Sequence, residues 1–305
     1  MIIGDRRFFT QAHCENMAGM APPYLCELAV HCLELVAEMS DMGIPFRFKG
    51  GNSLLVLLQA PRRFSIDVDI VSALPKKEMI KRVEELAEKS SVFKSVEIRQ
   101  HKTKPWLPMV SFKLFFDSHY QKKEEAYVML DAVLEPAPYP GQKKKISCGL
   151  LYFCWLDVEV PVISGMTADK FLTIGPSALG IPLGKNKEAQ RIKHIFDIGL
   201  LKKEEFEKEI FVNALASSME QENAIQRKEI TLKEVLVDTE CFCSLPLKFD
   251  KCPSAESAGD DHYLKEIVKG YDEFKKHVFK GEYRWEDFQN DCRTVLDLLK
   301  ETSIS

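Results

Sequence analysis

The chain lacks the features of a secreted or membrane protein. No apolar run is long enough to cross a bilayer, and the first ten residues, MIIGDRRFFT, lack the long apolar core of a signal peptide. The nine cysteines are an odd number scattered from Cys14 to Cys292, which fits free thiols better than a disulfide framework. We therefore expect a protein of the reducing cytoplasm without a membrane partner.

The sequence also has little net charge and no repetitive segment. Its 42 basic and 46 acidic residues leave a net charge of −4, so a nucleic-acid partner must meet a local basic patch and not a bulk basic field. We find no internal repeat or low-complexity tract. The 305 residues are enough for one large domain or two modest domains with a substantial core.

The most informative stretch of the chain, KGGNSLLVLLQAPRRFSIDVDIV, begins at Lys49. Lys49 ends a short predicted strand, and Gly50 and Gly51 then allow a tight turn that a ligand can approach without meeting a Cβ atom. Ser53 and the amides around it open a predicted helix over residues 54–59. The free N–H groups at a helix N-terminus suit phosphate.

Two acidic residues lie on the predicted strand that closes this stretch. Asp67 and Asp69 alternate with apolar residues, so both carboxylates point to one face of the strand. Such neighbours repel each other unless a hard divalent cation such as Mg²⁺ binds between them. Asp131 interrupts the apolar strand YVMLDAVLE at 127–135, and a buried strand seldom carries an unpaired Asp. The sequence therefore predicts three metal ligands, Asp67, Asp69 and Asp131.

Four motifs resemble one known family. They are GGNS at 50–53, RFSIDVD at 63–69, ADKFL at 168–172 and RIKHIFDIGLL at 191–201. Together they resemble the AbiEii-type nucleotidyltransferase toxins, a branch of the DNA polymerase β-like nucleotidyltransferase superfamily. Three positions depart from the family pattern: Asn52 replaces Thr, Ile66 replaces an acid, and His194 stands where the first Asp of the last motif is usual. The three metal acids are retained.

The resemblance implies a reaction and roles for the acids. It implies that a nucleoside monophosphate is moved from an NTP to an acceptor hydroxyl with Mg²⁺, or Mn²⁺, as cofactor. Asp67 and Asp69 are expected to hold both ions. Asp131 is expected to complete the catalytic ion site and to assist deprotonation of the acceptor.

The resemblance also implies which residues bind the nucleotide. Lys170 is expected to contact the triphosphate and Asp197 to orient Lys170. Without the resemblance, Lys170 reads as a solvent-exposed lysine and Asp197 as a surface partner of Lys193, four residues earlier on one helix. The residues expected to bind the nucleotide are Lys49, Gly50, Gly51, Ser53, Arg63 and Lys170.

The acceptor is left open by the sequence. Resemblance to the toxin branch implies a bacterial growth-inhibiting enzyme that acts on tRNA or another RNA 3′ end and is opposed by an antitoxin. One alternative is transfer to a small molecule such as an aminoglycoside, for which we expect an acidic cleft. A second alternative is a non-catalytic member of the fold that binds a nucleotide or a protein.

The predicted fold class is α+β. We expect a polymerase β-like nucleotidyltransferase domain over 1–160, with a mixed sheet flanked by helices, and a mostly helical domain over 161–305 that completes the active-site cleft. The helix that follows Pro22 and Pro23 has one apolar stripe, which we expect to pack under the sheet. Three further expectations concern local structure: a Pro/Gly/Lys loop at 136–145, a strand at 151–160 that closes the sheet, and an irregular loop at 241–259.

Overall fold

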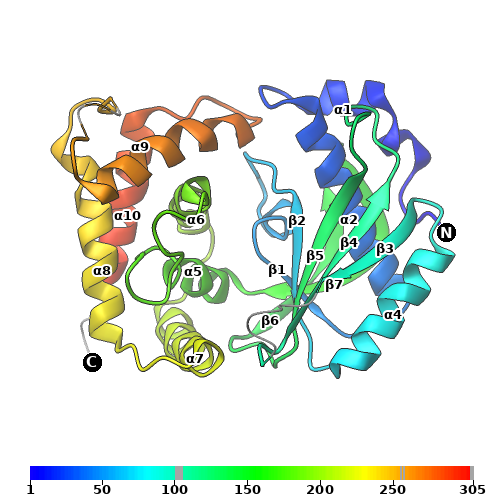
Figure 1. The fold of residues 1–305 in the computed structure, drawn as a ribbon, viewed down its shortest axis with the longest axis horizontal. Helices are drawn as coiled ribbons and strands as arrows, with labels where there is room; N and C mark the ends of the chain where they lie inside the picture. Colours follow the sequence, from blue (N-terminus) through cyan, green and yellow to red (C-terminus); the bar gives the residue numbers. More distant parts are fainter. Residues whose placement is uncertain (100–105, 255, 257, 303–305) are drawn as a thin grey trace. The chain divides into compact units, whose positions relative to one another are not determined.

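The computed structural model describes residues 1–99, 106–254, 256 and 258–302. The chain divides into two compact units (Figure 1). The first comprises Met1–Ala137 and Gly141–Pro161, and the second comprises Pro138–Pro140 and Val162–Ser305. No helix in the described part of the chain is long and apolar enough to cross a membrane.

The first unit is built on a five-stranded mixed sheet with the strand order β1-β2-β5-β4-β3. β2 and β5 are parallel, while the other neighbouring pairs are antiparallel. The prediction of a mixed sheet is therefore confirmed. The strands are β1 (Arg47–Lys49), β2 (Asp67–Val71), β3 (Phe93–Arg99), β4 (Met109–Phe116) and β5 (Ala126–Val133).

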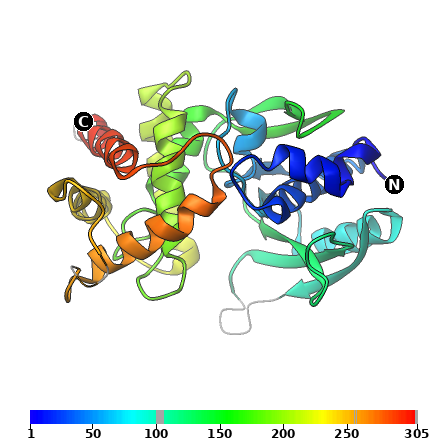
Figure 2. The same ribbon diagram turned by 90° about the horizontal axis from the view of Figure 1, so that it is seen from above.

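One face of this sheet is apolar and is covered by helices. Along β4 every second residue is fully buried, because a strand turns alternate side chains to opposite faces. The helices α2 (Pro23–Asp41) and α4 (Lys76–Lys89) pack on the sheet, as Figure 1 shows, and Figure 2 shows α4 in cyan beside β3. The ring of His31 on α2 stacks on Phe116 of β4 with 3.8 Å between centroids. The predicted packing of this helix under the sheet is confirmed. Two short helices precede α2, η1 (Arg6–Phe9) and α1 (Gln11–Met17).

α2 also buries charged side chains that its apolar stripe does not predict. Glu27, Glu34 and Glu38 are each less than 5 % exposed. The Glu34 carboxylate accepts hydrogen bonds from the backbone N–H groups of Ile3 (2.6 Å) and Gly4 (2.9 Å) and from the hydroxyl of Tyr152 (2.6 Å). α2 therefore fixes the first residues of the chain with a buried carboxylate.

Two local expectations for the first unit are wrong. Residues 136–145 are not a loop throughout, because β6 (Gly141–Cys148) begins at Gly141. The strand expected at 151–160 is β7 (Tyr152–Pro161), and it pairs antiparallel with β6 in a separate two-stranded sheet and does not close the main one. β6 is mostly half-buried with Ile146 alone fully buried, so it lacks the apolar alternation that marks a strand in a sequence.

The second unit is helical. The expected loop at 241–259 is wrong in its first part, because α8 continues to Ser244 and a 3₁₀ turn follows. Its core is rich in aromatic rings, with Phe196 packed against Phe274 and Tyr283 at centroid distances of 5.0 and 4.9 Å. The helices are α5 (Ile163–Phe171), α6 (Glu188–Leu201), α7 (Lys208–Gln226), α8 (Leu232–Ser244), η2 (Pro246–Lys248), α9 (His262–Phe274), η3 (Lys275–His277) and α10 (Trp285–Thr302).

The buried carboxyl of Glu38 makes stability depend on pH. Burial raises its pKa to about 8, against the opposing effect of the Ser90 hydroxyl, which donates a 2.8 Å hydrogen bond. The folded state therefore holds a proton that the unfolded state has lost, and stability falls as pH rises from about 4.5 through about 8. The wild type should lose roughly 5 kcal/mol in the free energy of unfolding over this range, and we expect Glu38→Gln to remove this loss.

Urea denaturation of the wild type and of Glu38→Gln at acidic and alkaline pH measures this difference. The exposed Glu88 on α4 provides a matched control, since Glu88→Gln should leave the pH profile of the wild type unchanged. Parallel pH profiles for the wild type and Glu38→Gln would contradict the prediction.

Candidate active site

The pairing of β2 with β5 brings the predicted acids together. The two strands run parallel in a register that aligns Asp69 with Asp131, and aligned residues on neighbouring strands point to the same face. Asp67 lies two residues before Asp69, shares this face and is aligned with Met129. Two of the three acids chosen from the sequence are therefore direct neighbours, and the third is on the same face.

The aligned pair is the centre of a row that crosses the whole sheet. Lys49 on β1 is aligned with Asp69, Asp131 with Ser111 on β4, and Ser111 with Arg99 on β3. We call these five residues the acid row. The Ser111 hydroxyl donates a hydrogen bond to Oδ1 of Asp131. Ser111 was not predicted, because only the strand pairing places it beside an acid.

The glycine turn lies directly against Asp69. Gly50 has a φ of +72°, and a Cβ atom built on it would lie 1.9 Å from Oδ2 of Asp69. Gly51 is equally close to its neighbours, with 2.6 Å between a built Cβ and the Ser65 hydroxyl. Only glycine fits both positions without a shift of these groups. The turn and the carboxylate predicted from separate parts of the motif thus form one site.

The residues after the turn are buried and hold it in shape. Ser53 is fully buried, and its hydroxyl donates to the carbonyl oxygen of Gly50 at 2.9 Å. Asn52 is also fully buried, and its amide donates to the carbonyl oxygen of Asp67 at 3.3 Å. The helix that follows, α3, covers only Leu54–Leu57 and ends earlier than the expected 59. One turn of helix has a weak dipole, so a phosphate here depends mainly on the backbone N–H groups of the turn.

Arg63 lies beneath the turn. It is 5 % exposed, its guanidinium donates to the carbonyl oxygen of Phe64 at 3.1 Å, and its Nη2 lies 2.8 Å from a Cβ atom built on Gly51. The buried Arg63 guanidinium therefore packs against the turn at Gly51. Lys49 is half-buried at the edge of the acid row. Phosphate contacts by Arg63 and Lys49 remain predictions.

The donor set suits Mg²⁺ in its usual mode of binding. Among the described residues, no three His, Cys, Asp or Glu side chains are gathered so that they hold a metal by themselves. Mg²⁺ usually takes one or two protein carboxylates and completes its shell with water and substrate phosphates. The aligned carboxylates of Asp69 and Asp131 supply the protein share of such a shell.

In the second unit, Lys170 and Asp197 form a buried ion pair. Nζ of Lys170 on α5 lies 2.7 Å from Oδ2 of Asp197 on α6, and the two side chains are 3 % and 0 % exposed. Lys170 is therefore not a solvent-exposed lysine. This contact is the geometry expected if Asp197 orients Lys170, whereas the contact of Lys170 with a triphosphate remains a prediction.

His194 contributes to the same junction of α5 with α6. The Thr173 hydroxyl donates to the carbonyl oxygen of Lys170 at 2.8 Å and also contacts Nδ1 of His194. This contact joins the His194 ring on α6 to Thr173, which lies two residues after the end of α5. The histidine that replaces a family Asp thus ties α6 to the end of α5.

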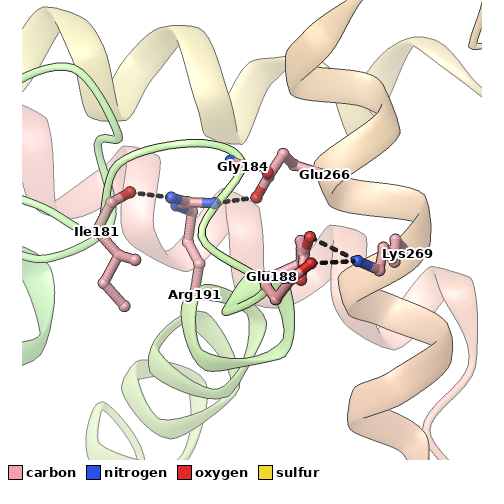
Figure 3. A network of polar contacts seen from close by, with 7 residues as sticks. Ile181, Gly184, Glu188, Arg191, Glu266 and Lys269 are labelled. Carbon is pink, nitrogen blue, oxygen red and sulfur yellow. Dashed lines mark hydrogen bonds and ion pairs between the residues drawn. The ribbon is translucent and has the colours of Figure 1, made fainter.

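A second buried cation fixes the loop that leads into α6. Arg191 is 1 % exposed and donates to the carbonyl oxygen of Ile181 and, at 3.2 Å, to Glu266 of α9 (Figure 3). Glu266 also accepts from the backbone N–H of Gly184 at 2.7 Å, and Lys269 contacts Glu188 at 2.8 Å. Burial lowers the pKa of Arg191, which the nearby Glu266 carboxylate opposes. The motif contained this arginine, but its carboxylate partner lies 75 residues away and could not be read from the sequence.

Comparisons with known proteins identify the family and the fold. Residues 34–290 match the family described as Nucleotidyl transferase AbiEii toxin, Type IV TA system. Among solved structures, MenT4, a nucleotidyltransferase toxin of Mycobacterium tuberculosis H37Rv, superimposes with a TM-score of 0.53 at 14 % identity, covering 96 % of this chain and 99 % of that one. An antigenic nucleotidyltransferase-like protein of Paracoccidioides brasiliensis has 15 % identity and a TM-score of 0.37, covering 67 % of this chain and 94 % of that one. No curated protein matches the chain significantly.

A mixed sheet that carries adjacent carboxylates beside a glycine turn fits a nucleotidyltransferase. The family match spans most of the chain, so the chain belongs to the AbiEii nucleotidyltransferase toxin family. The predicted fold class and the predicted enzyme class are both confirmed.

Loss of the Ser111 hydroxyl should weaken catalysis without unfolding the protein. Ser111→Ala leaves Asp131 without the hydrogen bond that fixes its carboxylate. We therefore expect the rate of nucleotidyl transfer to fall by roughly tenfold, which corresponds to about one hydrogen bond to a charged group. The Mg²⁺ concentration for half-maximal rate should rise. Ser95→Ala, which changes an exposed serine on the same face, is the control, and equal rates and metal dependence for both variants would refute a role for Ser111.

Removal of one partner of the buried ion pair should cost stability. Asp197→Ala leaves the Lys170 ammonium buried and unpaired, so we expect a loss of about 3–5 kcal/mol in the free energy of unfolding. Urea denaturation measures it. The control is Asp297→Ala, which breaks an exposed pair with Lys300 and should cost less than about 1 kcal/mol. A loss as small as that of the control would show that the pair does not hold α5 to α6.

Proposed function

We propose that the chain is a Mg²⁺-dependent nucleotidyltransferase toxin that moves a nucleoside monophosphate from an NTP to the 3′ hydroxyl of an RNA, with tRNA as the first candidate. The observation that carries the proposal is the alignment of Asp69 with Asp131 beside the Gly50 turn. Nucleotidyl transfer needs little covalent help from a protein and depends on positioning and on stabilisation of charge. Adjacent carboxylates next to a close backbone turn supply both.

The three acids have separate roles in this proposal. Asp67 and Asp69 would hold Mg²⁺, or Mn²⁺ in its place, and Asp131 would share the ion next to the acceptor. The bound ion would supply charge stabilisation at the attacking and leaving oxygens. Asp131, held by the Ser111 hydroxyl, assists removal of the proton from the acceptor hydroxyl.

The NTP lies on the β1 side of the acid row in this proposal. Gly50, Gly51 and Ser53 offer backbone N–H groups to the β- and γ-phosphates, and Lys49 adds a positive charge from the end of β1. The Ser53 hydroxyl already donates to Gly50, so it acts by shaping the turn. Lys170, oriented by Asp197, is the proposed counter-charge for the triphosphate.

The biological setting of the proposal follows from the family. A toxin of a toxin–antitoxin system has an antitoxin as its partner, so we propose one for this chain. We place the reaction in the bacterial cytoplasm. All nine cysteines are free thiols, in keeping with a reducing compartment.

A second acceptor class is favoured by an acidic pocket in the first unit. This cavity of about 410 Å³ is lined by Glu135, Asp157 and Glu159 together with Arg47 and Val71. On the paired strands β1 and β2, the aligned pair Arg47 and Val71 lies two residues from the aligned pair Lys49 and Asp69. The Glu135 carboxylate makes no hydrogen bond or ion pair with another described residue. Glu159 pairs with Arg47 and Asp157 pairs with Lys145, so Glu135 is the carboxylate that a small cationic acceptor of the aminoglycoside kind would meet.

The first experiment is transfer of label from each NTP, labelled at the α-phosphate, in the presence of Mg²⁺ and total cellular RNA. We expect label in a tRNA-sized band. Asp67→Ala and Asp69→Ala should each abolish it while circular dichroism shows an intact fold, because each removes a metal ligand. Omission of Mg²⁺ should have the same effect.

The other outcomes are equally informative. Full activity in Asp67→Ala or Asp69→Ala would refute the assignment of the acids. Label in an aminoglycoside and none in RNA would select the second acceptor class. Nucleotide binding without pyrophosphate release in any mixture would refute both acceptors.

A further inference from the structure

The sheet face that carries the acid row continues into aromatic and basic side chains. Tyr127 on β5 is aligned with Phe115 on β4, and Met129 is aligned with Lys113. Residues two apart on a strand share a face, so all four lie on the face of Asp131. We call Tyr127, Phe115 and Lys113 the Tyr127 patch.

Lys113 and Phe115 both contact the exposed Tyr127 ring and are themselves half-buried. Nζ of Lys113 lies 4.5 Å from the centroid of the Tyr127 ring, and the Phe115 ring packs edge-on against Tyr127 at 5.8 Å. Tyr127 is 37 % exposed, and its hydroxyl makes no hydrogen bond with another described residue. Lys113 also lies 3.8 Å from Glu97, an exposed neighbour on β3. The patch thus offers an aromatic ring with an ammonium group beside it.

The position of the patch relates it to the acceptor. Tyr127 lies four residues before Asp131 on the same strand, which is about 13 Å at roughly 3.3 Å per residue. Asp131 is the acid that borders β4, on the opposite side of the row from Lys49 and the glycine turn. A polymer that presents its terminal hydroxyl to Asp131 therefore finds the Tyr127 patch within a few monomers of its end.

We propose that the Tyr127 patch binds the single-stranded 3′ segment of the RNA acceptor. One base stacks on the Tyr127 ring, with Phe115 supporting the ring from its edge, and the Lys113 ammonium contacts the neighbouring phosphate. This inference rests on the proposed transfer to RNA and adds the surface that holds the acceptor. Stacking on an aromatic side chain beside a basic residue is the usual way in which proteins bind unpaired bases.

The size of the patch favours a nucleic acid over a protein partner. A tyrosine side chain buries roughly 150–250 Å², so the exposed share of Tyr127 amounts to about 60–90 Å². A stable protein interface needs about 800 Å² from each partner. A single exposed ring with a cation is too small to anchor a protein but is the size of one nucleobase.

The test measures RNA binding without catalysis, so it does not depend on turnover. The probe is a short fluorescein-labelled single-stranded RNA, titrated with the full chain in the absence of NTP and followed by fluorescence anisotropy. Tyr127→Ala should weaken binding by about tenfold, the range found when one stacked base loses its ring, and Tyr127→Phe should bind within about twofold of the wild type. Trp155→Ala removes a more exposed aromatic ring on β7 and should leave binding unchanged.

Salt dependence separates the roles of the ring and the ammonium. Lys113→Gln should lower the slope of log affinity against log salt by about 0.7, the value for one phosphate contact on a single strand, whereas Tyr127→Ala should leave the slope as it is. Wild-type affinity in Tyr127→Ala, or tighter binding of an RNA duplex than of the single strand, would overturn the proposal. If Tyr127→Ala binds RNA as tightly as the wild type but sediments differently, the patch is a protein interface and the proposal is overturned.

The two proposals fail separately. If the wild type labels RNA and Tyr127→Ala has the same KM for RNA, the reaction stands and the patch is refuted. If neither the wild type nor any variant transfers label, but the predicted differences in RNA affinity are observed, the patch stands as an RNA-binding surface and the proposed reaction is refuted.

Discussion

The structure of the first unit depends on one constraint, the parallel pairing of β2 with β5. Parallel neighbours lie about 4.8 Å apart, so the alignment of Asp69 with Asp131 sets two carboxylates next to each other. Like charges at this distance repel each other and favour the binding of a cation between them. The surrounding residues hold the pair in place. The Ser111 hydroxyl restrains Asp131, and the Gly50 turn packs directly against the Asp69 carboxylate.

In the second unit, unlike the first, buried charges of opposite sign are paired, and each of the two buried cations among its described residues contacts a carboxylate. Lys170 and Asp197 join α5 to α6, and Arg191 joins the loop before α6 to α9 through Glu266. A buried pair contributes little net stability, but loss of one partner costs much more. These pairs therefore specify how the helices pack more than they stabilise the fold. In the first unit the acids lie on an accessible sheet face, where a ligand can complete their interactions.

Much of the site could be read from the sequence because it lies in short, regular segments. Asp67 and Asp69 follow the period of a strand, so their common face needed no tertiary information. Asp131 stands out in an apolar run, but its place beside Asp69 depends on the pairing of β5 with β2. Ser111 could not be found in this way, since a serine on a half-exposed strand face is ordinary until β4 is paired with β5. β6 was missed for a related reason. Its lysine-rich sequence has no apolar alternation, and its strand conformation comes from pairing with β7.

Gly50 has a consequence for how this protein loses activity. Its backbone occupies the left-handed region, and the Asp69 carboxylate fills the place that a side chain would need. Every missense change at this codon adds at least a methyl group beside the acid pair, while the apolar core beneath the sheet is untouched. Gly50 is therefore a position where a single nucleotide change disturbs the acid pair and leaves the rest of the fold in place.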